Sequence, residues 1–402
     1  MRSIAFINNY FPALSATFIY REVIGLRSRG LAIRTFSIRK PPKSSLSQES
    51  LGLTDSTTYL LPVQVASFLS AHLYYILRNP WRYVRILFFL MTRRFDCPFK
   101  DRKRTFYHFC EAVYFAKIIE EDAEIAHIHA HYASHPTTVA FVASALSGRP
   151  FSFTAHAHDI WEDRLFLTEK LNAAAFAITC THYGRLSLLK AGNIREPDKI
   201  TTIYHGIDTS DFFPRPKADH HPITILNVGR LTWEKAHINL LKACSQLKRE
   251  GYLFRCLIAG EGPLLQTIQE FIAASGLTQE VTLLGRVFQE YIRELYSQAD
   301  IFALSSIQEN LPNVLLESLA MGLPVVASNI AGVPELILDR HTGLLVRPND
   351  PSHLAEAIRT LIDDPELRYS LARNGREHVC THFDIQFSLD KLQSLYESSL
   401  RR

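Results

Sequence analysis

Short apolar runs alternate with longer amphipathic stretches along the chain, and this alternation occurs twice. In the first half the β-rich runs are SIAFINN, LAIRTFSIR, IAHIHAHY, FSFTAHA, FAITCT and KITTIYHG. In the second half they are ITILNVGR, FRCLIAGEG, EVTLLGR, IFALSS, PVVAS and TGLLVRP. Stretches with helical spacing, such as TFIYREVIGLRSRG and HINLLKACSQLKREG, separate these runs. This α/β pattern predicts two doubly wound parallel sheets with right-handed crossovers.

The two halves meet at FFPRPKADHHP, residues 212–222, where prolines and charges predict a linker. We therefore expect an N-terminal Rossmann-like domain over residues 1–211 and a C-terminal one over residues 223–385. Residues 386–402 have apolar side chains at helical spacing and predict a final amphipathic helix. Because ligands of such sheets bind beyond the carboxyl ends of the strands, the chemistry is expected in a cleft faced by both domains.

Length and cysteine content fit a two-domain protein of the cytoplasm. The chain has 402 residues, 47% of them hydrophobic, which is enough for two cores. Its six cysteines include no CxxC pair and favour reduced thiols over a disulfide framework. The start, MRSIAFINNYFP, predicts a first strand and not a signal peptide.

Positive charge is concentrated in the first half of the chain. Residues 1–210 hold 25 Lys and Arg against 17 Asp and Glu. Residues 78–104 carry nine basic and two acidic side chains around the apolar run ILFFLM, which favours a peripheral site on an anionic membrane. The preceding YLLPVQVASFLSAHLYYIL is interrupted by polar residues and is a poor membrane-spanning helix. Residues 60–104 packed as core-facing helices remain the alternative, and clustered aromatics disfavour nucleic acid.

Two loops after predicted strands offer groups for a phosphorylated ligand. In NVGRLTWEKAH the strand ends at Gly229 and places Arg230 and Lys235 at its mouth, where both cations could hold a diphosphate. Solvated loop charges are the other interpretation of this pair. AGEGP, around Gly260, predicts a tight turn, and the chain lacks the glycine-rich signatures of dinucleotide and P-loop sites there.

The stretch QENLPNVLLESLAMGLPVVAS places Glu309 in a polar loop and Glu317 on an apolar helix that begins near Asn313. A carboxylate flanked by leucines is costly unless it is paired or hydrogen-bonded. We infer that a ligand satisfies it, although a solvent-facing position on the helix would serve as well.

Histidines present a competing chemistry. His127, His129 and His131 alternate along one predicted strand and share a face, and His156, His158 and Asp159 follow the next strand. Such side chains could bind zinc, or they could be hydrogen-bonded histidines within the fold.

Seven motifs together resemble a known family. They stand in the order typical of retaining GT-B glycosyltransferases. The motifs are FPALSATFIYRE, FSFTAHAHDIW, YHGIDTSDFFP, NVGRLTWEK, AGEGP, ENLPNVLLESLAMGLPVVAS and the pair GVPELI and TGLLV. The chain is especially similar to the bacterial nucleotide-sugar transferases (glycosyl transferases group 1) that build exopolysaccharide and lipopolysaccharide, including colanic-acid-type enzymes. It departs from them at Ala16, where the family usually has Glu, and at Ala236, where it usually has Gly.

The resemblance implies roles for particular residues. The implied catalytic residues are Arg230, Lys235, Glu309 and His156. Arg230 and Lys235 would contact the departing diphosphate, Glu309 would hold sugar hydroxyls and His156 would line the sugar pocket. Glu317 would accept hydrogen bonds from ribose hydroxyls. The other donor-binding positions are Gly229, Gly260, Arg286, Asn310, Leu311, Pro312, Asn313 and Val314. Thr17, Phe18, His156 and Asp159 lie on the implied acceptor side, and no metal or other cofactor is expected.

The implied reaction is transfer of a sugar from a nucleotide diphosphate sugar to an acceptor hydroxyl with retention at the anomeric carbon. The expected acceptor is a glycan or lipid-linked glycan at the inner membrane face, and the final helix is expected to cross back to the N-terminal domain. Three alternatives remain open at this point: a GT-B nucleotide-sugar epimerase, a non-catalytic subunit that binds the sugar nucleotide, and a metal-dependent hydrolase.

Overall fold

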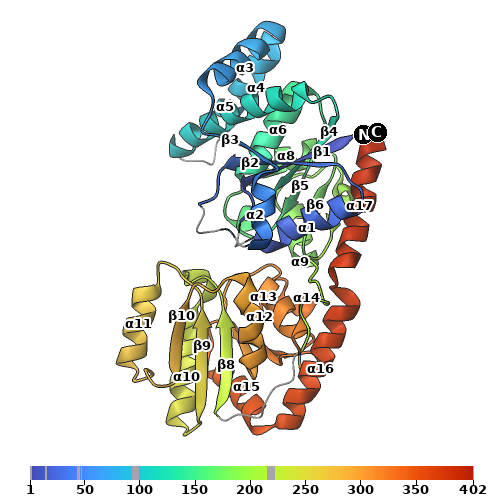
Figure 1. The fold of residues 1–402 in the computed structure, drawn as a ribbon. Helices are drawn as coiled ribbons and strands as arrows, with labels where there is room; N and C mark the ends of the chain where they lie inside the picture. The colour runs from blue at the N-terminus through green and yellow to red at the C-terminus, as the bar shows by residue number, and fades with distance from the viewer. Residues whose placement is uncertain are drawn as a thin grey trace. The chain divides into compact units, whose positions relative to one another are not determined.

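A computed structural model describes residues 2–13, 16–42, 46, 48–92, 99–214 and 222–401. The chain divides into two compact units, one from residues 1–203 with 389–402 and the other from residues 204–388. Each unit contains one parallel sheet (Figure 1). Most of the expected linker, residues 215–221, lies outside the described residues, as do Arg93, Arg94 and Phe95 of the basic stretch.

The first sheet has seven strands in the order β3-β2-β1-β4-β5-β6-β7. Their bounds are β1 (Ser3–Tyr10), β2 (Ile33–Arg39), β3 (Thr57–Leu61), β4 (Ile125–His131), β5 (Phe151–Ala155), β6 (Ala177–Thr179) and β7 (Ile200–Thr202). The sequence pattern did not predict β3, whose TTYLL run is short and only partly buried. It pairs with β2 at the edge of the sheet.

Helices cover both faces of this sheet. Their bounds are α1 (Thr17–Ser28), α2 (Gln48–Thr54), α3 (Val65–Arg78), α4 (Pro80–Thr92), α5 (Phe99–Glu121), α6 (His135–Ser147), α7 (His158–Trp161), α8 (Leu167–Ala173) and α9 (His182–Leu189). Helices α5 and α6 pack together and on the sheet through a core that includes Phe115 and Val139. On the other face lie α1 and the last part of α17 (Ile385–Arg401), where Tyr396 contacts Phe6 of β1.

The second sheet has six strands in the order β10-β9-β8-β11-β12-β13. Their bounds are β8 (Ile223–Val228), β9 (Phe254–Ala259), β10 (Val281–Gly285), β11 (Ile301–Leu304), β12 (Val325–Ser328) and β13 (Leu344–Val346). Nearly all positions of β8, β11 and β12 are buried because helices lie on both faces. Every strand predicted in this half is present.

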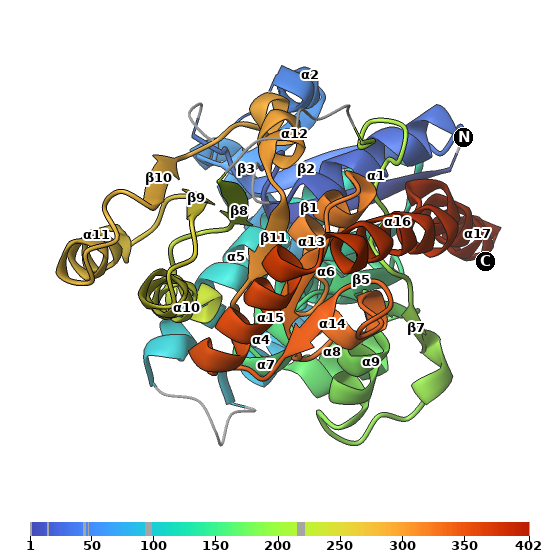
Figure 2. The ribbon, with the colours of Figure 1, turned by 90° about the horizontal axis from the view of Figure 1, so that it is seen from below.

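The helices of the second unit are α10 (His237–Arg249), α11 (Leu265–Ala274), α12 (Gln289–Gln298), α13 (Asn313–Ala320), α14 (Val333–Leu336), α15 (Pro351–Asp363) and α16 (Pro365–His382). Figure 2 shows β8 and β11 between α12 on one side and α10 and α15 on the other. Sequence sets the starts of α15 and α16, because Asp350 and Asp364 each accept a hydrogen bond from a first-turn amide and a proline follows each aspartate.

In both sheets the strand order reverses direction next to the first strand of the unit. The reversal lies between β1 and β4 in the first sheet and between β8 and β11 in the second. In doubly wound folds a ligand binds beyond the carboxyl ends of the strands at this point. Within the described parts of the chain, no helix is long and apolar enough to span a membrane.

Candidate functional site

The carboxyl ends of β8 and β11 bring Lys235 and Glu309 together. Lys235 belongs to a short 3-10 helix (Trp233–Lys235) after β8, and Glu309 lies in the loop between β11 and α13. The Lys235 Nζ and Glu309 Oε1 atoms are 2.5 Å apart, and the side chains are 18% and 9% exposed. A partly buried pair at the strand-order reversal suits a site for a charged ligand, since each group is held in place and only partly hydrated.

Serines fix this pair from the end of β11. Ser306 donates a hydrogen bond of 2.8 Å to the same oxygen of Glu309. Ser305 lies 3.1 Å from the carbonyl oxygens of Lys235 and Ala236, to which it donates. The loop after β8 and the loop after β11 are therefore one hydrogen-bonded unit.

Arg230 is oriented by a different carboxylate. Its guanidinium lies 3.0 Å from Glu234, and the arginine side chain is 66% exposed. Burial acts to raise the pKa of Glu234, but a hydrogen bond from Thr232 and the positive charges of Arg230 and Lys235 hold it below its usual value. Glu234 is therefore ionised at neutral pH and keeps Arg230 at the mouth of β8.

The glycines of this edge permit close approach of two loops. A Cβ on Gly260 would lie 1.8 Å from the carbonyl oxygen of Gly229, and the loop amide of Leu231 donates to the carbonyl of Glu261. No residue but glycine fits at position 260 without moving the Arg230 loop. Arg286, at the end of β10, pairs with Glu261 at 2.9 Å and so lies on the same edge.

The N-terminus of α13 lies beside the pair. Pro312 is its N-cap residue, and the first helical residues Asn313 and Val314 have amides for which the helix itself supplies no acceptor. Asn310 and Leu311, just before the helix, are buried. Pro312 has no N–H group, so it shapes the entry to the helix and cannot donate to a ligand as its neighbours can.

Glu317 is buried on α13, at 6% exposure, and is not turned to solvent. The hydroxyl of Tyr296, from α12, donates to its Oε2 atom at 2.9 Å. Burial and the neighbouring carboxylate raise the pKa of Tyr296 well above its usual value, so the phenol remains a donor. Tyr296 fixes the orientation of the Glu317 carboxylate.

Ala236 follows Lys235 and has a backbone conformation that favours glycine. Its φ is 46°, in the left-handed region, and it is the N-cap residue of α10. An L-residue there costs roughly 1–2 kcal/mol. This conformation explains why the family usually has glycine at this position. In this chain alanine adopts it instead.

We expect Ala236→Gly to raise the free energy of unfolding of the second unit by about 1 kcal/mol, because glycine adopts φ above zero without strain. Chemical denaturation would measure it. Ala273→Gly, at an exposed position in α11, is the matched control and should lower stability by up to about 1 kcal/mol. A loss of stability in both variants would contradict the role of φ.

The first unit places three of the predicted residues together near the end of β5. Phe18, in the first turn of α1, lies beside the His156 ring, with ring centroids 4.9 Å apart, and buried Thr17 precedes it. Tyr132 contacts the same imidazole at 4.7 Å. Burial lowers the pKa of His156 to about 3, so its imidazole is neutral at physiological pH and suited to hydrogen bonding of an uncharged group.

Asp159 supports this edge through the main chain. Its carboxylate accepts hydrogen bonds from the amides of Ala133, His156 and Ala157 at 2.6 to 3.1 Å. It therefore joins the loops after β4 and β5 and holds His156 in position. We expect Asp159 to position the acceptor side of the site and not to touch the acceptor.

The histidines of β4 form a buried hydrogen-bonded row. Ser152 bridges His127 Nε2 and His129 Nδ1 at 2.7 and 2.8 Å, and His127 Nδ1 lies 2.7 Å from Ser399 of α17. Burial lowers the pKa of His127 to about 3 and that of His129 well below its usual value. These contacts match the alternative of hydrogen-bonded histidines within the fold. Glu22, His129 and His131 also bring three potential ligand atoms within 4.8 Å of one another.

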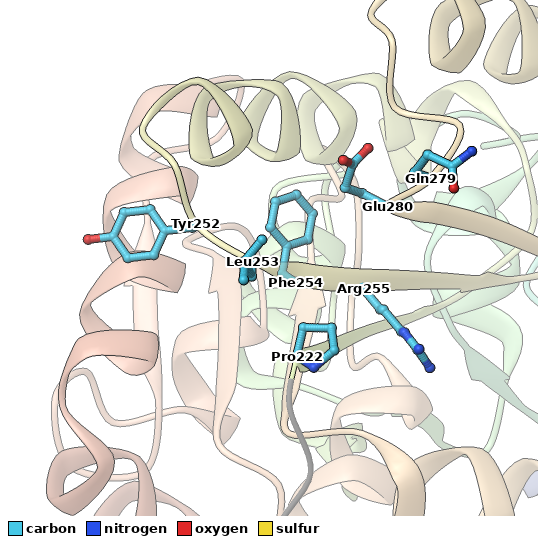
Figure 3. A pocket seen from close by; sticks show the side chains of 7 residues that line it. All are labelled: Pro222, Tyr252, Leu253, Phe254, Arg255, Gln279 and Glu280. Atoms are coloured by element: carbon cyan, nitrogen blue, oxygen red, sulfur yellow. The ribbon is translucent and has the colours of Figure 1, made fainter.

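A pocket of about 470 Å³ lies at the opposite edge of the second sheet. Figure 3 shows its lining, which comes from the amino ends of the strands: Pro222, Tyr252, Leu253, Phe254, Arg255, Gln279 and Glu280. Since ligands of doubly wound sheets bind at the carboxyl ends, this pocket is separate from the candidate donor site.

Sequence reasoning missed Tyr296, Ser306 and Glu234, each of which orients a predicted residue. Tyr296 precedes Glu317 by 21 positions, and only the packing of α12 against α13 brings them together. Ser306 could have been noticed, because a serine three residues before Glu309 at a strand end can reach its carboxylate.

Comparison with known proteins gives two family matches. A model described as Glycosyltransferase Family 4 matches residues 15–211, and one described as Glycosyl transferases group 1 matches residues 208–378. Alpha-D-kanosaminyltransferase of Streptomyces kanamyceticus is 35% identical over 178 residues, 44% of this chain and 46% of the relative. The putative colanic acid biosynthesis glycosyltransferase WcaL of Escherichia coli K12 is 34% identical over 224 residues, 54% of each chain. The matches thus span about half the length of these curated relatives.

Among solved structures, that of Anabaena Alr3699/HepE in complex with UDP-glucose has a TM-score of 0.74 and 18% identity, covering 99% of this chain and 100% of that one. At this identity the likeness shows the fold. It is the GT-B architecture that the motif resemblance implied, with a parallel sheet in each unit. With two adjoining family models that extend from residue 15 to residue 378, the chain belongs to the group 1 glycosyltransferases.

Proposed function

We propose that the protein is a retaining glycosyltransferase that moves a sugar from a nucleotide diphosphate sugar to an acceptor hydroxyl. The observation that carries this proposal is the partly buried Lys235–Glu309 pair at the strand-order reversal, beside the N-terminus of α13. A cation, a carboxylate and a helix N-terminus at one point suit a ligand that joins a diphosphate to a polyhydroxylated sugar.

Each part of the donor then has a matching group. Arg230, Lys235 and the first amides of α13 would hold the diphosphate, whose negative charge grows as it departs. Glu309 would accept hydrogen bonds from sugar hydroxyls, and Glu317, fixed by Tyr296, would accept them from the ribose. Gly229 and Gly260 let the two loops that carry these groups approach each other closely, and Arg286 stands at the edge of this region.

The reaction requires no nucleophile from the protein. The bond between the anomeric carbon and the diphosphate oxygen breaks, and the acceptor oxygen bonds to that carbon on the same face. The acceptor proton passes to the departing phosphate oxygen. The cations take the role that a metal has in other transferases, so we propose a metal-independent reaction, with neutral His156 orienting the sugar.

The relatives support a choice of donor and acceptor to test first. Alr3699/HepE was solved with UDP-glucose, which makes a UDP-sugar the first donor to test. WcaL is described as a colanic acid biosynthesis enzyme, so we propose a lipid-linked glycan in exopolysaccharide or lipopolysaccharide synthesis as the acceptor. Such an acceptor would bring the enzyme to the anionic inner face of the membrane from the cytoplasm.

Thermal denaturation with UDP, GDP, ADP and their sugar conjugates tests the donor site. A ligand at 100 times its dissociation constant adds about 2.7 kcal/mol to the free energy of unfolding. We expect one nucleotide class to raise the melting temperature and Glu317→Gln to reduce that rise. An anomer-resolved transfer assay of the wild-type enzyme should show retention. If none of these ligands stabilised the wild-type protein, the donor site would be assigned wrongly.

A further inference from the structure

The helix pair α3 and α4 exposes apolar side chains in an unusual way. Figure 1 shows these helices side by side at one end of the first unit, next to α5. Each packs on α5, through buried Ala71 and Tyr75 of α3 and buried Ile86 and Leu90 of α4. The opposite face of each helix is apolar as well and points to solvent.

We name this solvent-facing set the outer stripe. On α3 it follows positions i, i+4, i+8 and i+12, and on α4 positions i, i+3 and i+7, so on each helix it is a continuous row. Its residues are Val65, Leu69, Leu73, Leu77, Trp81, Val84 and Phe88. The exposed fractions of Leu77, Trp81 and Phe88 are 74%, 78% and 66%. A helix with apolar rows on two opposite sides normally buries both of them, so something is expected to cover the stripe.

Charge indicates what covers it. Residues 62–92 contain three arginines and no aspartate or glutamate. Arg82 and Arg85 are exposed on α4, and Arg78 lies at the end of α3 with its side chain 66% exposed. Apolar side chains flanked by arginines, with a tryptophan between them, are typical of elements that enter the boundary of an anionic bilayer.

We propose that the α3–α4 pair is a membrane-docking element that inserts its outer stripe into the lipid surface while its arginines contact lipid phosphates. The docking proposal rests on the proposed function in one respect only, the lipid-linked acceptor, which gives the enzyme a reason to bind a membrane. With 14 and 13 residues, the helices are about 20 Å long and too short to span the hydrocarbon core. They therefore lie parallel to the membrane surface. Apolar burial supplies most of the binding, in contrast to the charge-driven attachment expected from residues 78–104.

The aromatic side chains within residues 81–89 face two directions. Trp81 and Phe88 are exposed as an anchor must be. Tyr83 and Phe89 instead pack inward, Tyr83 on His72 and Phe89 on Phe141. The row on α3 was not predicted, because its spacing becomes meaningful only once Ala71 and Tyr75 are known to face α5.

Vesicle flotation of the full-length protein tests the proposal. Phosphatidylcholine vesicles should carry the protein at both low and high salt, and added phosphatidylglycerol should strengthen binding at low salt. The variant Leu77→Ser/Trp81→Ser/Phe88→Ser should bind both vesicle types at least tenfold more weakly. Arg82→Gln/Arg85→Gln should lose the preference for anionic vesicles and still bind neutral ones.

The matched control removes exposed apolar side chains of the second unit, by Leu253→Ser/Tyr291→Ser/Tyr369→Ser, and should bind vesicles like the wild type. Wild-type protein that fails to float with either vesicle, or equal losses in the control, would overturn the proposal. The proposal would also be overturned if the wild type did not float with vesicles and light scattering showed it to be a dimer that only the stripe variant dissociates. The outer stripe would then cover a second copy of the chain. Nucleotide-induced thermal shifts, recorded on the same variants, report the donor site separately.

Discussion

Arg230→Ala should lower kcat/KM for sugar transfer by about 100-fold and leave stability nearly unchanged, whereas Lys235→Ala should lower both. Each substitution removes a cation aimed at the departing diphosphate, an effect of about 3 kcal/mol on the transition state. The two differ in the folded protein. The ion pair of Arg230 with Glu234 is exposed and contributes at most about 1 kcal/mol. Loss of Lys235 leaves Glu309 buried without its cation, which costs about 3 kcal/mol.

A double variant separates the two consequences for Lys235. In Lys235→Ala/Glu309→Gln the buried charge is gone, so the free energy of unfolding should return to within about 1 kcal/mol of the wild type. Transfer should stay low, because no cation is restored. Denaturant titration and initial rates with saturating acceptor measure both. A double variant as unstable as Lys235→Ala would show that the pair does not set the stability of this loop.

The fold of the second half could be predicted closely because its central strands β8, β11 and β12 are buried on both faces. Runs such as ITILNV and PVVAS are mostly apolar and end at glycine or serine, which marks their bounds. Strand β3 could not be found in this way, since its edge position lets polar Thr57 and Thr58 enter the sheet. Burial gives a strong sequence signal, and an edge strand gives a weak one.

The candidate site was predictable where residues follow one another along the chain. Arg230, Lys235, Glu309 and Glu317 stand in two short motifs, each at one strand end. Which group pairs with which could not be predicted, because Lys235 and Glu309 are 74 positions apart and meet only when β8 and β11 become neighbours. The same holds for Tyr396 of α17, whose hydroxyl meets Glu22 near the start of the chain.

Glu22 of α1 is a carboxyl group in an apolar and histidine-rich setting. The Tyr396 hydroxyl lies 3.4 Å from its Oε1 atom and His131 Nε2 lies 3.7 Å from the same atom. Burial raises the pKa of Glu22 from 4.5 to about 8, and the hydrogen bond from Tyr396 opposes this only in part. The C-terminal helix therefore packs on a carboxyl group that is mainly protonated at neutral pH, so its packing depends on pH.

We expect Glu22→Gln to stabilise the packing of α17 relative to the wild type, by an amount that grows as the pH rises. Between pH 4.5 and about 8 the packed state holds a proton on Glu22 that the opened state has lost, so wild-type stability falls by about 1.4 kcal/mol per pH unit. Glutamine cannot ionise, and the histidines contribute equally in both proteins. Hydrogen exchange of residues 389–401, compared at each pH, should show a difference that grows up to about pH 8 and then levels off. Asp390→Asn alters an exposed carboxylate on the same helix and should show no such growth. A difference between Glu22→Gln and wild type that is constant with pH would mean that the Glu22 carboxyl is ionised in the packed state.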